Sequence, residues 1–298
     1  MFHTHFRSAT ASGVMAVLAL FNTAVVMALP SATACSPVFT ISGISGGFST
    51  HTLLDFSTQK AGGNAASFLS SHGIMISDYP VGSTPVAHDF SPSAVSFGQG
   101  ALNLKVSAYV SSQGSVHGAE IVTNSEFLYG SMRTVMKSSA VPGIVEGIFF
   151  YRKLFVSIVA LREAAELQFV VADNDTQETD WEILTSTTLK ASADVPAGIW
   201  TTNQNFVLNQ PSNHETVPLS FDPSQGFHEY RIDWVPGSTT FYLDGVQKTK
   251  LTTFTPVVAA HLIWNVWSSG DPEWSNGPPT SDSVTQIRSI EYYTGYCS

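Results

Sequence analysis

Three acidic side chains stand at alternate positions in a chain that is otherwise poor in charge. The stretch QETDWEILTS, residues 177–186, contains Glu178, Asp180 and Glu182, although only 12% of the 298 residues are charged. In a β-strand, alternate residues point to the same face. We therefore expect the three carboxylates to share one face, with Thr179 and Trp181 on the opposite face, toward a core.

Two carboxylates on one strand face can carry out the chemistry of a retaining glycosidase. The outer Cα atoms are expected roughly 13 Å apart at about 3.3 Å per residue. Glutamate side chains that lean together reduce this to roughly 5–6 Å between carboxyl groups, near the about 5–5.5 Å of retaining enzymes. One carboxylate attacks the anomeric carbon and the other protonates the leaving oxygen. Asp180 can share a proton with a neighbour, and its charge helps to keep the acid protonated.

Two other interpretations of this acidic row remain open on the residues alone. The row could be a solvated strand face, although sheets normally avoid like charges side by side. It could also hold calcium, although it lacks the carbonyl-rich loop of a typical calcium site. The nine histidines are scattered, and no Cys/His spacing resembles a zinc site. We expect no metal and no cofactor.

The elements around the acidic row are predicted to be short strands. Turn residues recur every eight to twelve positions between runs rich in Val, Ile, Thr, Phe and Tyr, a pattern typical of a β-sandwich. Asp244-Gly245 favours a type I′ hairpin turn. No repeat or low-complexity linker divides the chain, so we predict one all-β domain over residues 35–298.

The N-terminal 34 residues differ in character from the rest. An apolar run from Gly13 to Pro30 follows His3, His5 and Arg7, and it ends in Ala32-Thr33-Ala34. This pattern predicts a secretory signal peptide, residues 1–34, that is cleaved before Cys35. A retained signal anchor is the alternative, because the run is long enough to span a membrane. With cleavage, we expect a secreted monomer that has no membrane segment.

Cysteine content and net charge further limit the class of protein and the kind of partner that the sequence allows. Cys35 and Cys297 are the only cysteines, so an oxidising exterior would allow them to form a disulfide; the alternative is two free thiols. The formal net charge of −10 argues against a nucleic-acid partner, which needs basic surface. The same net charge is compatible with an uncharged substrate.

The motif Glu178-Thr-Asp180-Trp-Glu182, with its flanking blocks, resembles glycoside hydrolase family 16. The resemblance covers most of residues 118–279 and rests on the blocks GAEIVTNSEFLYGSMRTVMKSS, VPGIVEGIFFY, FHEYRIDWVPGSTTFYLDGV and LIWNVWSSGDPEWSNGPP. It implies a concanavalin A-like jelly roll: two antiparallel sheets with a concave substrate cleft. It also implies that Glu178 is the nucleophile, Glu182 the general acid/base and Asp180 the auxiliary carboxylate.

Aromatic side chains are expected to bind the flat faces of sugars. Strand alternation in HLIWNVW puts Ile263, Asn265 and Trp267 on one face, and the family resemblance implies that Asn265 and Trp267 face the cleft. Trp274, in the following loop, could also stack on sugar. Core packing is the competing role for each tryptophan, and we assign it to Trp181, Trp234 and Trp264.

One segment departs from the family pattern. Residues 153–173, KLFVSIVALREAAELQFVVAD, separate GIFFY from NDTQETDWEIL, which the family joins by a short turn. We interpret the segment as a translated intron, since Arg152-Lys153-Leu154 can be encoded with the donor sequence GTAAGT. The alternative is a real lid or partner helix, because Leu154, Ile158, Leu161 and Ala165 share a helix face.

The function expected from this resemblance is a secreted retaining endo-β-glucanase of the fungal type, acting on β-1,3/β-1,4-glucan. A cell-wall transglycosylase would use the same two glutamates. A lectin-like glucan-binding module on the same sandwich is the non-catalytic alternative.

Overall fold

The computed structural model describes residues 36–82, 85–152, 177–207 and 210–298. These belong to one compact unit, Cys35–Ser298. The predicted signal peptide, Cys35 and the segment 153–173 lie outside the described residues, so the expectations about them remain predictions. No helix within the described ranges is both long enough and apolar enough to cross a membrane.

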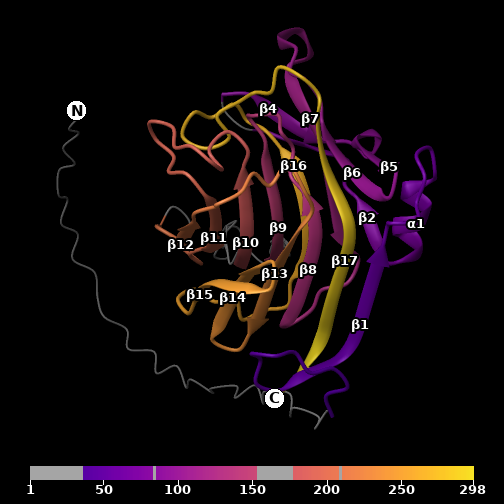
Figure 1. Ribbon diagram of the computed structural model, residues 1–298, viewed down its shortest axis with the longest axis vertical. Coiled ribbons are helices and arrows are strands. Elements are labelled where there is room, and N and C mark those ends of the chain that lie inside the picture. Colours follow the sequence, from indigo (N-terminus) through magenta and orange to yellow (C-terminus); the bar gives the residue numbers. More distant parts are fainter. Residues whose placement is uncertain (1–35, 83–84, 153–176, 208–209) are drawn as a thin grey trace, which may run out of the picture. The chain divides into compact units, whose positions relative to one another are not determined.

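The described residues form two large sheets that pack face to face (Figure 1). The eight-stranded sheet has the order β15-β14-β13-β8-β17-β6-β5, with β1 also paired to β17. Its strands are β1 (Gly47–Asp55), β5 (Val95–Gly98), β6 (Ala101–Val106), β8 (Gly130–Lys137), β13 (His228–Val235), β14 (Ser238–Leu243), β15 (Val246–Leu251) and β17 (Ser283–Cys297).

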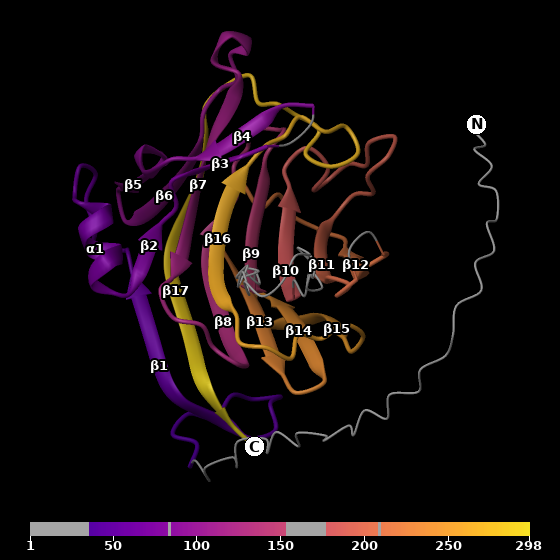
Figure 2. The ribbon, with the colours of Figure 1, turned by 180° about the vertical axis from the view of Figure 1, so that it is seen from behind.

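The nine-stranded sheet has the order β12-β11-β10-β9-β16-β7-β4-β3, with β2 also paired to β7 (Figure 2). Its strands are β2 (Ile74–Ile76), β3 (Tyr79–Val81), β4 (Ala87–Phe90), β7 (Ser115–Thr123), β9 (Val145–Arg152), β10 (Gln177–Leu184), β11 (Ile199–Asn203), β12 (Asn213–Val217) and β16 (His261–Trp267). Of the strand pairs described, only β4 with β7 is parallel. The predicted all-β jelly-roll sandwich of two antiparallel sheets is therefore confirmed.

Helices contribute little to this architecture. The helix α1 (Ala65–Ser71) begins at Asn64, whose side-chain oxygen accepts a hydrogen bond from the Ser67 N–H at 2.9 Å. The other helical segments in the described part of the chain are two 3₁₀ turns, η1 (Pro92–Ala94) and η2 (Ser111–Gln113). The described part of the molecule is therefore built mainly by strands and the loops between them.

The predicted hairpin turn at Asp244-Gly245 is present between β14 and β15. Asp244 has φ 50° and Gly245 has φ 73°, and a type I′ turn needs positive φ at both central positions. Pro236-Gly237 joins β13 to β14, with Gly237 at φ 76°. These short turns fix the register of three neighbouring strands.

The core between the sheets contains the three tryptophans to which sequence assigned core packing. Trp181, Trp234 and Trp264 are each at most 1% exposed. Trp181 of β10 meets the ring of Phe241 of β14 edge to face at 5.3 Å, and the Trp264 Nε1 donates to Thr134 Oγ1 at 2.8 Å. Burial of one such side chain stabilises a fold by about 1.5–3 kcal/mol. These contacts hold the nine-stranded sheet against its partner and so fix its outer face.

Candidate active site

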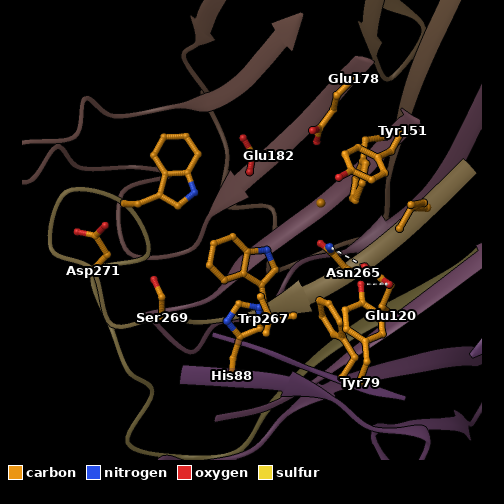
Figure 3. Close-up of a pocket in the computed structure, with 16 residues that line it drawn as sticks. Tyr79, His88, Glu120, Tyr151, Glu178, Glu182, Asn265, Trp267, Ser269 and Asp271 are labelled. Carbon is orange, nitrogen blue, oxygen red and sulfur yellow. Dashed lines mark hydrogen bonds between the residues drawn. The ribbon is translucent and has the colours of Figure 1, made fainter. Parts of the chain in front are cut away.

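Strand β10 places the acidic row on the outer face of the nine-stranded sheet. Thr179, Trp181 and Ile183 are fully buried toward the core. Glu178 and Glu182 are half-buried on the opposite face, and both project into one cavity (Figure 3). The pairing of β10 with β9 continues from Gln177 to Leu184 without a bulge. The expected alternation of carboxylate and core residues is confirmed.

Cross-strand register extends the acidic row into three rows of side chains, because paired residues in a sheet share one face. Glu182 lies in the first row, whose other members are Gly147 of β9, Asn265 of β16, Glu120 of β7 and Trp200 of β11. This row is polar on one side of Glu182 and aromatic on the other.

The other two rows start from Asp180 and Glu178. The Asp180 row continues through Phe149, Ile263 and Val122, which form a small apolar cluster. The Glu178 row continues through Tyr151 and His261. The floor of the site therefore consists of three adjacent rows that run across the strands. They are the Glu182 row, the mainly apolar Asp180 row and the Glu178 row with its aromatic members.

A cavity of about 700 Å³ lies over this floor. It is lined by both predicted catalytic glutamates and by all three predicted sugar-binding residues (Figure 3). Its complete lining is Tyr79, Val81, His88, Phe90, Glu120, Gly147, Phe149, Tyr151, Glu178, Glu182, Ile263, Asn265, Trp267, Ser269, Asp271 and Trp274. Asp180 lies in the floor between the two glutamates but is fully buried.

Burial and mutual repulsion raise the pKa values of the three carboxyl groups in the row. Burial, followed by the charge of Asp180, raises the pKa of Glu178 well above its ordinary value. The pKa of Glu182 is raised by burial and then by the charges of Asp180 and Glu178. Burial raises the pKa of Asp180 to about 7, against hydrogen bonds from Thr202 and Gln204 that lower it. The row therefore retains protons at pH values where exposed carboxyl groups have lost them.

Glu120 is a site residue that the sequence analysis did not single out. It is 5% exposed. Its Oε1 accepts hydrogen bonds from Ser77 Oγ at 2.7 Å and from Tyr79 Oη at 2.9 Å, and its Oε2 accepts one from Asn265 Nδ2 at 3.3 Å. Its only sequence signal is its place in the strand block GAEIVT, where a lone glutamate has no partner nearby.

Asn265 and Gly147 form the floor between Glu120 and Glu182. Asn265 is 9% exposed, and its Oδ1 has no hydrogen-bond partner among the described atoms. A Cβ on Gly147 would stand 2.6 Å from that oxygen, so only glycine leaves space there. Asn265 Oδ1 is therefore a buried acceptor without a partner just beneath the cavity floor, an exception among buried polar atoms.

Two of the cavity tryptophans rest on other aromatic rings. Trp267 stacks on His88 with ring centroids 4.9 Å apart and planes at 19°. Burial lowers the pKa of His88 and so favours the neutral imidazole, while the charge of Asp89 acts in the opposite direction. Trp274 packs on Trp200, with centroids 5.2 Å apart. Trp200 was not predicted, since only its register with Glu182 shows that it faces the same side.

The expected absence of a metal site and the expected Cys35–Cys297 disulfide can be compared with the structure only within the described residues. The described ranges contain no group of three or more His, Cys, Asp or Glu residues placed to hold a metal ion. Cys297 is buried at the end of β17. Because its predicted partner, Cys35, lies outside the described residues, the disulfide remains a prediction.

A two-sheet jelly roll with a row of carboxylates beneath an aromatic-lined cavity has the architecture of a glycoside hydrolase. A family model confirms the assignment: residues 84–285 match glycosyl hydrolases family 16, and the chain belongs to this family.

Curated relatives match shorter stretches. A β-glucanase of Paenibacillus macerans is 39% identical over 72 residues, which are 24% of this chain and 30% of that protein. A β-glucanase of Bacillus licheniformis is 38% identical over 90 residues, which are 28% of this chain and 37% of that protein. A Crh-like protein of Arthroderma benhamiae is 27% identical over 136 residues, or 40% of this chain and 28% of that protein. The chain therefore spans about a third of the length of the curated relatives it matches.

Solved structures share the fold over most of both chains. The Bacillus licheniformis β-glucanase superposes with a TM-score of 0.61 at 18% identity, covering 83% of this chain and 99% of that one. The apo Crh5 transglycosylase gives a TM-score of 0.55 at 18% identity, covering 84% and 87%. These likenesses support the jelly-roll architecture.

Proposed function

We propose that the protein is a retaining endo-β-glucanase that hydrolyses β-1,3/β-1,4-glucan through a glycosyl-enzyme intermediate. The single observation that carries the proposal is the pair Glu178 and Glu182, which project from one strand, on either side of buried Asp180, into a cavity lined by aromatic side chains. Family 16 membership and the β-glucanase relatives support the same reaction class.

The two glutamates take complementary parts in the proposed reaction. A carboxylate oxygen of Glu178 bonds to the anomeric carbon while the bond to the leaving oxygen breaks, and Glu182 donates the proton that the leaving oxygen needs. In the second step, water attacks the same carbon, its proton passes to Glu182, and the ester to Glu178 breaks. The raised pKa of Glu182 favours the protonated form required for the first step.

Asp180 has a positioning part in this scheme. It is buried between the glutamates, and Gln204 Nε2 donates to its Oδ2 at 3.4 Å. Its Oδ1 has no partner among the described atoms. A carboxyl in this place can share a proton with either neighbour as charge moves along the row.

Glu178→Gln tests the assignment, with Glu229→Gln, at a half-buried glutamate of the other sheet, as the matched control. We expect the control to release reducing sugar from lichenan, laminarin or barley glucan at the parent rate and Glu178→Gln to release almost none. If the parent degrades no β-glucan, or if Glu178→Gln is as active as the parent, the catalytic assignment fails. Binding of glucan by an inactive parent would instead favour the lectin-like module.

Secretion belongs to the same proposal and rests on the N-terminal sequence pattern. We propose cleavage before Cys35, export of the remaining chain, and a glucan of a cell wall or plant polymer as the substrate. N-terminal sequencing of protein recovered from the culture medium tests this. A mature chain that begins upstream of residue 30 would contradict it.

The segment 153–173 can be tested by deletion. Arg152 and Gln177 are Cα partners at the ends of β9 and β10. Without residues 153–173, the residues Asn174, Asp175 and Thr176 would join these strands as a three-residue hairpin loop, a common connection. Under the intron interpretation, we expect the deletion variant to fold and to equal or exceed the full chain in glucanase activity. Loss of folding or activity, or transcripts that read through the segment, would favour a real lid or partner helix.

A further inference from the structure

Gln204 reaches buried Asp180 from the neighbouring strand β11. It follows the last residue of β11, and the pairing of Asn203 with Thr179 places it level with Glu178. The Gln204 backbone N–H donates to the Glu178 carbonyl at 3.1 Å. Strand alternation puts Gln204 on the outer face of the sheet, together with the acidic row. The half-buried Gln204 side chain therefore lies beside Glu178 and extends back to Asp180.

A chain of hydrogen bonds fixes the orientation of the Gln204 amide. Ser212 Oγ accepts from the Asn205 N–H at 3.2 Å and donates to Gln204 Oε1 at 2.6 Å. Because Oε1 accepts from Ser212, the amide NH₂ group points to Asp180, where Nε2 lies 3.4 Å from Oδ2. A reversed amide would face the Asp180 carboxylate with an oxygen, which that carboxylate repels.

The loop after β11 holds Ser212 in place for this contact. Asn205 Nδ2 donates to the Pro211 carbonyl at 3.0 Å, and Asn205 Oδ1 accepts from the Val207 N–H at 2.9 Å. These bonds tie the start of the loop to the residue before Ser212. Residues 203–213 contain no charged side chain. The loop therefore supplies Asp180 with a neutral N–H donor and with no opposite charge.

The two oxygens of Asp180 lie in different surroundings. Oδ2 accepts from Gln204, whereas Oδ1 is buried and has no partner among the described atoms. Burial raises the pKa of Asp180 to about 7, and hydrogen bonds from Thr202 and Gln204 act against this rise. An N–H donor favours the ionised carboxylate, because only that form is a full acceptor. When Asp180 carries a proton, Oδ1 is the oxygen that is free to hold it.

The charge of Asp180 matters because both neighbouring glutamates respond to it. After burial, this charge is the next cause that raises the pKa of Glu178 and of Glu182. In a row that shares protons, a higher proton affinity of Asp180 draws the proton from Glu182 and eases the ionisation of Glu178. The titratable side chains that share this face on nearby strands are Tyr151 of β9, His261 of β16, Glu120 of β7 and His214 of β12.

We propose that Gln204, oriented by Ser212, is a positioning residue that favours the ionised form of Asp180 and so leaves the proton of the row on Glu182. The inference rests on the proposed function and assigns control of its acid to the loop after β11. Without the amide N–H, Asp180 competes better for the proton that Glu182 must donate, and Glu178 loses a repelling neighbour. Both changes move glucan hydrolysis to lower pH.

The pH profile of kcat/KM on barley glucan tests this role. We expect Gln204→Leu, which keeps much of the side-chain volume without the amide, to move both limbs of the profile down by about one pH unit, or about 1.4 kcal/mol. Ser212→Ala frees the amide to turn and should cause a smaller shift in the same direction. Gln247→Leu, at an exposed glutamine of the other sheet, should keep the parent profile. A loss that is equal at every pH would make Gln204 merely structural and overturn the proposal.

Thermal unfolding tests the same hydrogen bond without substrate. With a higher pKa in the folded state, Asp180 stays protonated to higher pH, so the fall in Tm should extend about one pH unit further in Gln204→Leu. This difference should vanish in the Asp180→Asn background, where that carboxyl is gone. Equal profiles in parent and Gln204→Leu, or a difference that persists with Asp180→Asn, would reject the role of Gln204. If the parent hydrolyses no glucan, the proposed function fails separately, and the Tm comparison still decides.

Discussion

The two sides of Glu182 differ in how their side chains are held. Toward β7, Glu120 is fixed by hydrogen bonds from Ser77, Tyr79 and Asn265. Toward β12, Trp200 contacts the tilted rings of Trp274 and His214, and its N–H has no acceptor among the atoms that the structure describes. Hydrogen bonds require atoms at set positions, whereas ring stacking requires only a flat partner. One sheet can thus combine selectivity on one side of the acidic row with tolerance on the other.

The largest loss of activity is expected for a substitution at Glu182, which lies between the two sides. Glu182→Gln removes the proposed proton donor, and general acid catalysis contributes about 10²–10⁴-fold. We expect a loss of that size on barley glucan and a much smaller one on a nitrophenyl oligoglucoside, because nitrophenolate leaves without protonation. Rates of reducing-sugar and nitrophenol release measure the two losses. Equal losses on both substrates would contradict the acid role.

The polar side is tested at Glu120. In Glu120→Gln, an amide NH₂ replaces an acceptor that faces the Asn265 amide, and hydrogen bonds to a charged group contribute about 1.5–3 kcal/mol. We expect KM for the nitrophenyl oligoglucoside to rise roughly 10- to 100-fold, whereas Trp200→Ala leaves it nearly unchanged. Steady-state kinetics on both variants decide. The comparison breaks down if the two substitutions raise KM alike.

The floor that joins the two sides is tested at Gly147. The Cβ of Gly147→Ala would stand 2.6 Å from Asn265 Oδ1 and 3.0 Å from the Phe149 ring. Overpacking of this kind costs about 1–3 kcal/mol of folding free energy. We expect weaker glucan binding together with a lower midpoint of urea unfolding. A variant with parent stability and parent KM would show that Asn265 can yield without consequence.

The acidic row should make the stability of the ligand-free protein depend on pH. The pKa of Asp180 rises from an ordinary 3.8 to about 7 on folding, so between these values the folded state holds a proton that the unfolded chain has lost. The free energy of unfolding therefore falls as pH rises through this window, and Asp180→Asn should flatten the fall in Tm. Thermal unfolding at pH 4 to 8 measures it, and an unchanged slope would contradict the shift.

Glu146 supplies the control for that experiment. Burial raises its pKa to about 7 as well, but it accepts hydrogen bonds from Ser138 and Thr285 between the sheets, away from the cavity. Glu146→Gln should also flatten the Tm profile. Unlike Asp180→Asn, it should leave the pH profile of glucan hydrolysis unchanged, which separates the cleft from the core.

The acidic row was predictable because it is a local pattern. Alternation within one strand placed Glu178, Asp180 and Glu182 opposite Trp181. The same rule put Asn265 and Trp267 on one face of their strand, and the family resemblance assigned that face to the cleft. Glu120 and Trp200 were missed because their roles come from register between strands far apart in the sequence. Nothing near Glu120 in the chain indicates that Tyr79 and Asn265 will donate to it.

The middle position of β17 also determines when the protein can fold. This last strand pairs with β1, β6 and β8, and its register with β1 joins Gly47 to Cys297 (Figure 1). The eight-stranded sheet therefore cannot close until residues 283–297 have been synthesised and are free to pair, and contacts of such long sequence separation form slowly. Until then, β1 lacks the strand it pairs with and β8 is paired only on its β13 side, so both expose edges that can join other chains. Truncation within residues 283–297 should therefore remove the whole sandwich.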